Sequence, residues 1–183
     1  MKRTAFLLAM AAVIGTAFAD APLSRPSNLE VWSKNKQYVA VLKHQESKTS
    51  IFRVMPDGKR EKTWEMDGWF RWTHLSNDGE YFAIPYWGAN LLSLNYKKED
   101  IMLRLVQRGK TIATVTLTDL IEDFSQLQRT ASHYYWGRCT GFNKQNEFVI
   151  TTVEGNCFLV SPKDGKIRKQ EKKLQPEDSS DKK

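Results

Sequence analysis

Two Trp-x-Arg-x-Thr triplets are the residues of this sequence best suited to binding chemistry. Alternate residues of a β-strand lie on one face, so this spacing predicts that each triplet lines one strand face. The guanidinium could then bind a carboxylate or phosphate through its planar donors, while the indole stacks on a ring. The triplets are Trp69, Arg71 and Thr73, and Trp136, Arg138 and Thr140.

A structural role for the two arginines is the alternative, and we favour it. Each triplet precedes a glutamate, Glu80 or Glu147, with which its arginine could form an ion pair. Each arginine could instead lie on the ring of its own tryptophan. Because arginine and glutamate recur together, the pattern favours structure over ligand binding. The candidate ligand-binding residues are nevertheless Trp69, Arg71, Trp87, His133, Trp136 and Arg138.

The residue types used in catalysis form no recognisable constellation. His44, His74 and His133 have no metal-ligand spacing from one another or from a cysteine. The sequence has no Gly-x-Ser-x-Gly elbow and no glycine-rich phosphate loop. We therefore expect no enzyme activity, no metal and no cofactor; a hydrolase whose active site is assembled from distant segments is the alternative.

The two cysteines, Cys139 and Cys157, give conflicting indications. An even number in an exported protein predicts a disulfide. In the repeat described next, however, they lie on the first and third strands of one sheet, about 10 Å apart from twice the strand spacing. A disulfide needs Cα atoms within about 7 Å. The sequence therefore leaves two alternatives, a disulfide or a pair of reduced, buried thiols.

A strand-rich unit occurs three times. Three segments align without gaps, and each has a large apolar residue, four polar turn formers, Glu or Gln, and an aromatic residue before a β-prone run. Such a pattern predicts a hairpin. Farther along, each unit has a second strand that ends in a glycine-containing turn. The sequence therefore predicts three antiparallel four-stranded meanders. The first matches are 32–38, 75–81 and 142–148; the second are 51–58, 102–109 and 158–165.

The run Ser-Asn-Asp-Gly-Glu-Tyr-Phe-Ala-Ile at 76–84, with Asp-Gly turns at 57–58 and 164–165, resembles the WD-type β-propeller repeat of the variety common in exported bacterial proteins. The resemblance implies a propeller-like fold that binds other molecules on one face, and it implies no catalytic residue. Closed propellers typically have four to eight sheets. Three repeats therefore predict an all-β open partial propeller or a small β-sandwich.

Two segments interrupt the repeats. Asp119 and Glu122 have the spacing of a helix start, and apolar residues follow at helical spacing, so we expect one short helix near 119–128. The long connection 85–100 is the other irregular segment. Loops held on a rigid sheet often carry function, so these two insertions are where a site is expected.

The two ends of the chain predict its compartment. Residues 1–19 have a basic start, an apolar stretch and the small-residue pattern Ala17-Phe18-Ala19, which is typical of a cleaved signal peptide. The apolar stretch is shorter than the roughly 20 residues that span a bilayer, so we expect no stable membrane insertion. We expect a mature protein that starts near Asp20 and is periplasmic or extracellular. It would have a single β-repeat domain at 20–169 and a disordered charged tail at 170–183.

Charge argues against nucleic-acid binding. The net charge is +7, of which the signal carries +2 and residues 166–183 carry +3, leaving +2 for residues 20–165. A nucleic-acid binder concentrates positive charge on its folded domain. We expect an exported non-catalytic binding or scaffold protein that recognises another envelope or secreted protein, or itself, through exposed strand edges. A module that binds a glycan or a small anionic ligand on tryptophan platforms is the alternative.

Overall fold

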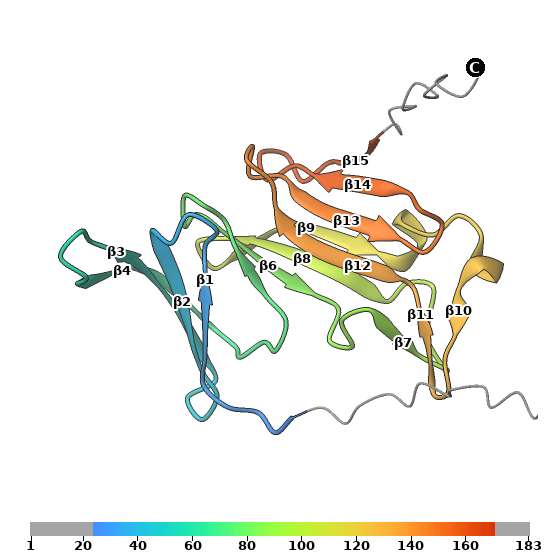
Figure 1. Ribbon diagram of the computed structural model, residues 1–183, viewed down its shortest axis with the longest axis horizontal. Coiled ribbons are helices and arrows are strands. Elements are labelled where there is room, and N and C mark those ends of the chain that lie inside the picture. Colours follow the sequence, from blue (N-terminus) through green and yellow to red (C-terminus); the bar gives the residue numbers. More distant parts are fainter. Residues whose placement is uncertain (1–23, 171–183) are drawn as a thin grey trace, which may run out of the picture.

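Three four-stranded antiparallel sheets form the fold, as a computed structural model that describes residues 24–170 shows (Figure 1). In sheets 1 and 3 the strands follow one another in space as in sequence, and in sheet 2 only the short β7 is left out of that order. The predicted all-β fold with three meanders is therefore confirmed. The predicted signal at 1–19 lies outside the described residues, and so does the predicted tail at 170–183 except for Gln170, which is the last residue of a strand.

The strands match the repeat units. Sheet 1 contains β1 (Leu29–Trp32), β2 (Tyr38–Lys43), β3 (Lys48–Val54) and β4 (Arg60–Asp67). Sheet 2 contains β5 (His74–Leu75), β6 (Tyr81–Pro85), β8 (Ile101–Gln107) and β9 (Lys110–Thr116). Sheet 3 contains β12 (Gly137–Phe142), β13 (Phe148–Thr152), β14 (Cys157–Val160) and β15 (Ile167–Gln170).

The first hairpin turn has the same backbone conformation in all three sheets. Lys36, Gly79 and Asn146 occupy the same position of the aligned segments, and their φ angles are 61°, 70° and 58°. A residue in the left-handed backbone conformation closes the turn at this point. Glycine and asparagine adopt that conformation most easily. The repeat therefore extends from sequence to backbone geometry.

These three turns bond to one another and form what we call the turn hub. The Asn35 side-chain amide donates to the carbonyl of Asn77 at 2.8 Å, and Asn146 Nδ2 donates to Asp78 Oδ2 at 2.7 Å. Lys34 Nζ, in the turn of sheet 1, donates to the carbonyl oxygen at residue 142 of sheet 3 at 2.7 Å. The hub therefore ties the first strands of the three sheets together at one end.

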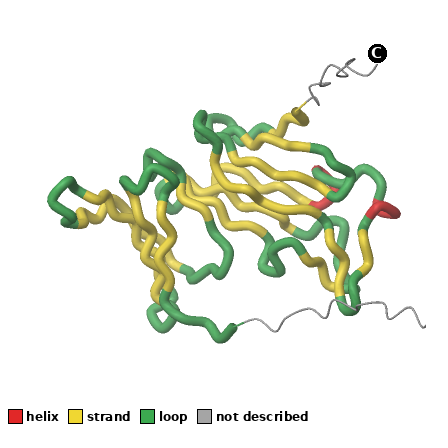
Figure 2. Tube along the Cα trace, viewed as in Figure 1, coloured by secondary structure: helices red, strands yellow, loops and turns green. Residues whose placement is uncertain are grey.

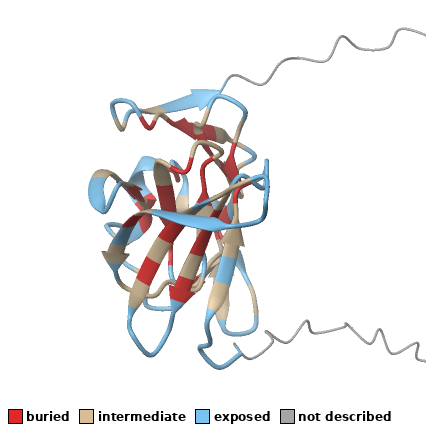
Figure 3. Cartoon of the chain, turned by 90° about the vertical axis from the view of Figure 1, so that its left-hand side faces the viewer, coloured by how far each residue is buried: buried red, intermediate tan, exposed pale blue. Residues whose placement is uncertain are grey.

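Sheet 2 is covered on both faces, whereas the other two sheets bury one face. One core cluster lies between sheets 1 and 2 and the other between sheets 2 and 3. In β6, residues 82–85 are all buried, which fits a strand between two neighbours; in β13, buried and half-buried residues alternate. Buried positions run along the strands and the turns are exposed (Figure 3).

A small additional sheet joins the two insertions. It has the order β10 (Gln128–Arg129), β11 (His133–Tyr135) and β7 (Leu91–Ser93), and we call it the linker sheet. β7 lies in the long connection of sheet 2, and β10 and β11 lie in the chain segment that connects sheet 2 to sheet 3 (Figure 1). The long connection is therefore paired with β11, and β11 is paired in turn with β10, which begins at the last residue of the predicted helical insertion.

The helical insertion differs in detail from the prediction. Two single-turn 3₁₀ helices, at Leu117–Asp119 and Phe124–Gln126, replace one continuous helix near 119–128 (Figure 2). Asp119 does not start a helix; its carboxylate accepts from the backbone N–H of Thr116 at 2.7 Å. The Glu154 carboxylate holds the next residues by accepting from the backbone N–H of Asp123 at 2.7 Å. The Asp119 carboxylate therefore caps the single turn whose N-cap is Thr116, three residues before the predicted helix start.

The contact between sheets 1 and 2 gives a test of the packing. A Cβ atom at Gly79 would overlap the Tyr38 ring, whereas a Cβ at Gly58, whose φ of +81° is similar, would meet nothing within 4 Å. Gly58→Ala should therefore cost only the left-handed strain of about 1–2 kcal/mol. Gly79→Ala should cost about 1–3 kcal/mol more, because the ring must move. Urea unfolding of both variants measures the difference; equal losses would contradict this packing.

Candidate functional site

The irregular connections of all three sheets lie at the end of the molecule opposite the turn hub, and we call this the connection end. In an antiparallel meander, connections alternate between the two ends, so those after second and fourth strands share an end. Hydrogen bonds join them: the backbone N–H of Gly68 donates to the carbonyl of Ser47 at 2.6 Å, and that of Trp136 to the carbonyl of Asn90 at 3.2 Å. Any site built from the connections must therefore lie here.

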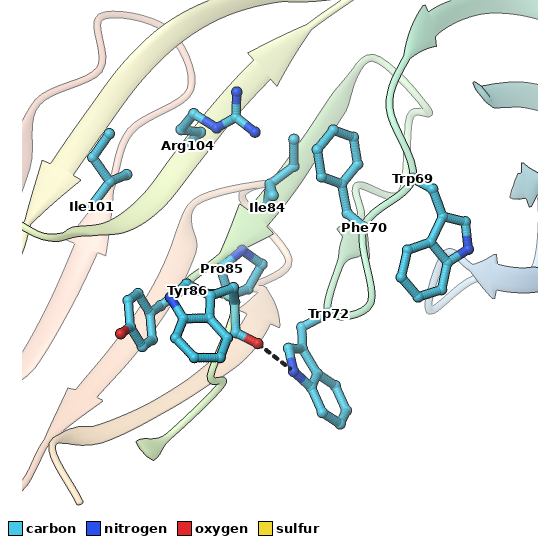
Figure 4. A pocket seen from close by; sticks show the side chains of 9 residues that line it. Trp69, Phe70, Trp72, Ile84, Pro85, Tyr86, Ile101 and Arg104 are labelled. Atoms are coloured by element: carbon cyan, nitrogen blue, oxygen red, sulfur yellow. Dashed lines mark hydrogen bonds between the residues drawn. The ribbon is translucent and has the colours of Figure 1, made fainter. Parts of the chain in front are cut away.

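An aromatic cleft of about 240 Å³ opens between the segment before β5 and the end of β6 (Figure 4). Its walls combine five aromatic rings, three aliphatic side chains and one guanidinium. Such a surface binds apolar and planar groups by area burial and stacking. The lining residues are Trp69, Phe70, Trp72, Ile84, Pro85, Tyr86, Trp87, Ile101 and Arg104.

Trp72 and Trp87 present the exposed apolar surface of this cleft. Trp87 is 65% exposed and Trp72 is 39% exposed, and Ile101 beside them is also exposed. The indole N–H of Trp72 donates to the carbonyl oxygen of Trp87 at 3.1 Å, the bond drawn in Figure 4. This bond satisfies the polar atom of Trp72 and fixes its ring at the rim of the cleft without a ligand.

A second cleft of about 290 Å³ lies on the other side of Trp72, and we call it the arginine cleft. Trp72 and Pro85 line both clefts, so the two are adjacent and share a wall. The rest of its lining comes from β5, the long connection of sheet 2, and β12. Its residues are Trp72, His74, Pro85, Ala89, Asn90, Arg138 and Cys139.

His74 and Cys139 line the same cleft, and both are neutral at pH 7. Burial, and to a lesser extent the charge of Lys34, lower the pKa of His74 to about 4. Burial raises the pKa of the Cys139 thiol to about 12. A nucleophilic cysteine needs the opposite change, a lowered pKa beside a positive group. These two side chains therefore do not form a thiolate–imidazolium pair.

The predicted ligand-binding residues separate into three that line the clefts and three that do not. Trp69 and Trp87 line the aromatic cleft, and Arg138 lines the arginine cleft. Arg71 lies outside both clefts. His133 is in β11, paired with Ser93 of β7, and does not line either cleft.

The prediction for Trp136 as a stacking platform is wrong. Its side chain is fully buried between sheets 2 and 3, and its indole N–H donates to the carbonyl oxygen of Ala89 at 2.8 Å. The predicted shared face of Trp69, Arg71 and Thr73 is also wrong, because residues 68–73 form no strand. Gly68 turns the chain there with a φ of +113°.

The proposed ion pairs of the two arginines are wrong as well. Glu80 pairs with Arg108 at 2.9 Å, and Glu147 pairs with Arg168 at 2.6 Å. Arg71 instead lies over the ring of Trp69, 5.5 Å from its centroid, as the other structural interpretation expected. Arg138 is exposed on β12 and has no ion pair among the described residues.

Sequence reasoning did not single out Phe70, Trp72, His74, Tyr86 or Arg104 as site residues. Arg104 carried a usable signal, because it interrupts an otherwise apolar strand, β8. Its guanidinium lies 5.5 Å from the centroid of the Phe70 ring. Trp72 carried no such signal, because its neighbour Trp87 lies in a distant connection.

Both cysteines are free. Residue 139 of β12 pairs with Ile150 of β13, and residue 157 of β14 pairs with Thr151 of the same strand. A whole strand therefore separates the two cysteines, as the meander predicted, and the possible disulfide between Cys139 and Cys157 is not formed.

Among residues 24–170, no group of three or more His, Cys, Asp or Glu side chains is arranged to hold a metal ion. In the same part of the chain, no helix has the length and apolar composition required to cross a bilayer.

Comparison with known proteins defines no family. No family profile and no curated protein matches the chain. Among solved structures, a periplasmic gluconolactonase of Pseudomonas aeruginosa is similar with a TM-score of 0.38 and 10% sequence identity, covering 78% of this chain and 38% of that one. The chain thus spans well under half the length of that enzyme. The WD-type resemblance of the repeats stays a prediction.

The buried His74 predicts a pH dependence of stability. Its pKa is about 4 in the folded state against an ordinary value of 6.5, so between these values the unfolded chain binds a proton that the folded chain does not. Stability should fall by about 2–3 kcal/mol as the pH drops from 6.5 to 4.5. His74→Gln should remove that part of the slope in urea unfolding, whereas His44→Gln, at an exposed position, should keep it. The same slope in His74→Gln as in the wild type would contradict the burial of this imidazole.

Proposed function

We propose that this chain is an exported binding protein that recognises a segment of another envelope or secreted protein with the aromatic cleft, and that it catalyses no reaction. The observation that carries the proposal is that three exposed large apolar residues, Trp72, Trp87 and Ile101, line one cleft at the connection end. A soluble domain that keeps large apolar side chains together on its surface usually does so for an interaction.

The geometry of the cleft suits a protein partner. Tryptophan and arginine dominate the binding energy of protein interfaces, and the cleft offers both types at its rim. Trp72 is already hydrogen bonded to Trp87, and Arg104 is already placed over Phe70. Because these side chains are fixed before binding, a partner does not have to order them. Binding then costs less side-chain entropy, and the affinity is higher for the same contacts.

The size of the two clefts also favours side chains of a macromolecule over a whole small molecule. Their volumes are about 240 and 290 Å³. Pockets for small ligands usually measure roughly 300–1,000 Å³ and enclose most of the ligand. Each cleft is therefore suited to one or two side chains of a partner whose remaining surface stays outside.

A glycan is the second candidate, and Trp87 is the observation that favours it. An indole that is 65% exposed can stack on the apolar face of a sugar ring. A glycan array probed with the purified protein distinguishes this case from protein recognition.

Export is the second part of the proposal and rests on residues 1–19. The mature protein should be found outside the cytosol and should begin at or close to Asp20, because cleavage follows the pattern Ala17-Phe18-Ala19. Cell fractionation and intact-mass measurement of the full-length gene product check this. A cytosolic protein that keeps its first 19 residues would contradict export.

Partner capture tests the binding role. The mature protein should retain a specific protein from an envelope extract of the producing cells, and that protein, once purified, should bind with a Kd measurable by calorimetry. Trp72→Ala and Trp87→Ala should each weaken this binding roughly 10-fold or more, because exposed aromatic anchors dominate interfaces. Trp87→Ala should leave the melting temperature nearly unchanged.

Leu94→Ala is the matched control. Leu94 is a large exposed apolar residue of the same connection, but it lines neither cleft. Binding that survives both tryptophan substitutions, or that Leu94→Ala weakens equally, would contradict recognition by the aromatic cleft.

A further inference from the structure

We propose that the partner segment is acidic: the aromatic cleft takes an apolar side chain, and Arg138 in the adjacent arginine cleft binds a carboxylate of the same segment. This inference rests on the proposed function and names the chemistry of the partner. The inference is drawn from the positions of the charged side chains around Trp72 in the described structure.

The two arginines that line the clefts have no carboxylate partner among the described residues, as is also true of Arg53 on sheet 1. On the sheets, Arg60 pairs with Glu30, Arg108 with Glu80 and Arg168 with Glu147. No ion pair within residues 24–170 involves Arg104 or Arg138.

The cleft walls contain no compensating negative charge. None of the residues that line the two clefts is an aspartate or a glutamate, yet each cleft has one arginine. The other polar side chains of the arginine cleft are neutral at pH 7, as shown for His74 and Cys139 above. An incoming carboxylate would therefore meet attraction from the guanidinium and no repulsion from the walls.

Both guanidinium groups keep their donors available. The contact of Arg104 with Phe70 is made with the face of the ring at 5.5 Å, and the N–H donors of a guanidinium lie in its own plane. The side chain of Arg138 makes no hydrogen bond with another described residue, and this exposed residue lines its cleft. Arginine binds carboxylates through two parallel N–H donors, which gives strong and directional contacts.

The shared wall makes one short segment sufficient for both clefts. Trp72 and Pro85 separate the apolar surface on one side from Arg138 on the other. An apolar side chain against Phe70 and Trp87 and a nearby aspartate or glutamate on Arg138 would fill both. Arg104 adds positive charge on the apolar side, which steers an acidic segment toward the site.

A random peptide library displayed on phage and panned on the full-length mature protein tests the inference. Selected peptides should contain Asp or Glu close to a bulky apolar residue. For a synthetic peptide of this kind, Asp→Asn should weaken binding about 10-fold or more, because it removes a charge-assisted contact. Arg138→Gln should weaken binding by a similar factor and abolish the preference for Asp over Asn. Arg104→Gln should give a smaller loss that shrinks at high salt.

Arg53→Gln is the matched control, because Arg53 is an exposed arginine without an ion pair in the described structure and lies outside both clefts. It should change neither affinity nor the preference for Asp. The melting temperature of Arg138→Gln should match that of the wild type, which separates lost binding from lost folding.

The possible failures are distinguishable. Peptides whose binding needs Trp72 and Trp87 but is indifferent to Asp→Asn and to Arg138→Gln would overturn the acidic segment and leave the proposed function intact. Selection of no peptide, or of peptides indifferent to both tryptophans, would overturn both. Arg138-dependent binding of an oligogalacturonate probe without any selected peptide would assign the cleft to an acidic glycan and overturn the peptide.

Discussion

The burial of sheet 2 on both faces is the constraint on which the rest of the structure depends. Its strands β6 and β8 are apolar on each side and cannot be stable in water without a sheet against either face. Sheets 1 and 3 provide those two covers, and each needs only one apolar face. The three sheets of residues 24–170 thus bury two apolar clusters, one on each face of sheet 2.

The turn hub constrains the connections at one end of the molecule more than those at the other end. At that end, the first hairpins of the three sheets are hydrogen bonded to one another, so their length and backbone conformation are constrained. At the connection end, the connections differ in length between the sheets, and the chain carries its long connection, its 3₁₀ turns and the linker sheet there. The candidate clefts lie at that end, where loops differ between repeats and the sheets keep them in place.

The repeats were predictable because their signal is local. A polar turn between apolar runs spans seven residues, and its geometry is fixed by those residues, so the aligned segments gave the correct hairpins. The clefts were only partly predictable. Trp72 and Trp87 are neighbours because two connections meet, which no local pattern encodes.

The wrong prediction that Trp69 and Arg71 share one strand face is a second example of what a local sequence pattern does not encode. Gly68 and the ring of Phe70 pack so closely that a Cβ at Gly68 would overlap that ring, and the chain turns there and does not extend as a strand. In the corresponding segment before sheet 3, residue 136 is buried in the core between sheets 2 and 3, and β12 begins immediately after it. The two segments are alike in sequence, but each meets a different neighbour, and the neighbour decides which side chains reach the surface.

The outward face of sheet 1 bears on where the proposed partner would bind. Trp32 on that face is half-buried, and the guanidinium of Arg60, itself paired with Glu30, lies 5.2 Å from its ring centroid. Farther along, Glu65 bridges Lys48 and Lys62 beside the half-buried Phe52. Charged side chains of this kind are how natural sheets avoid pairing with other chains. On this face, cationic side chains thus lie over the Trp32 ring, whereas among the described residues none lies over the rings of Trp72 or Trp87. That contrast favours recognition through the clefts over recognition through a free sheet surface.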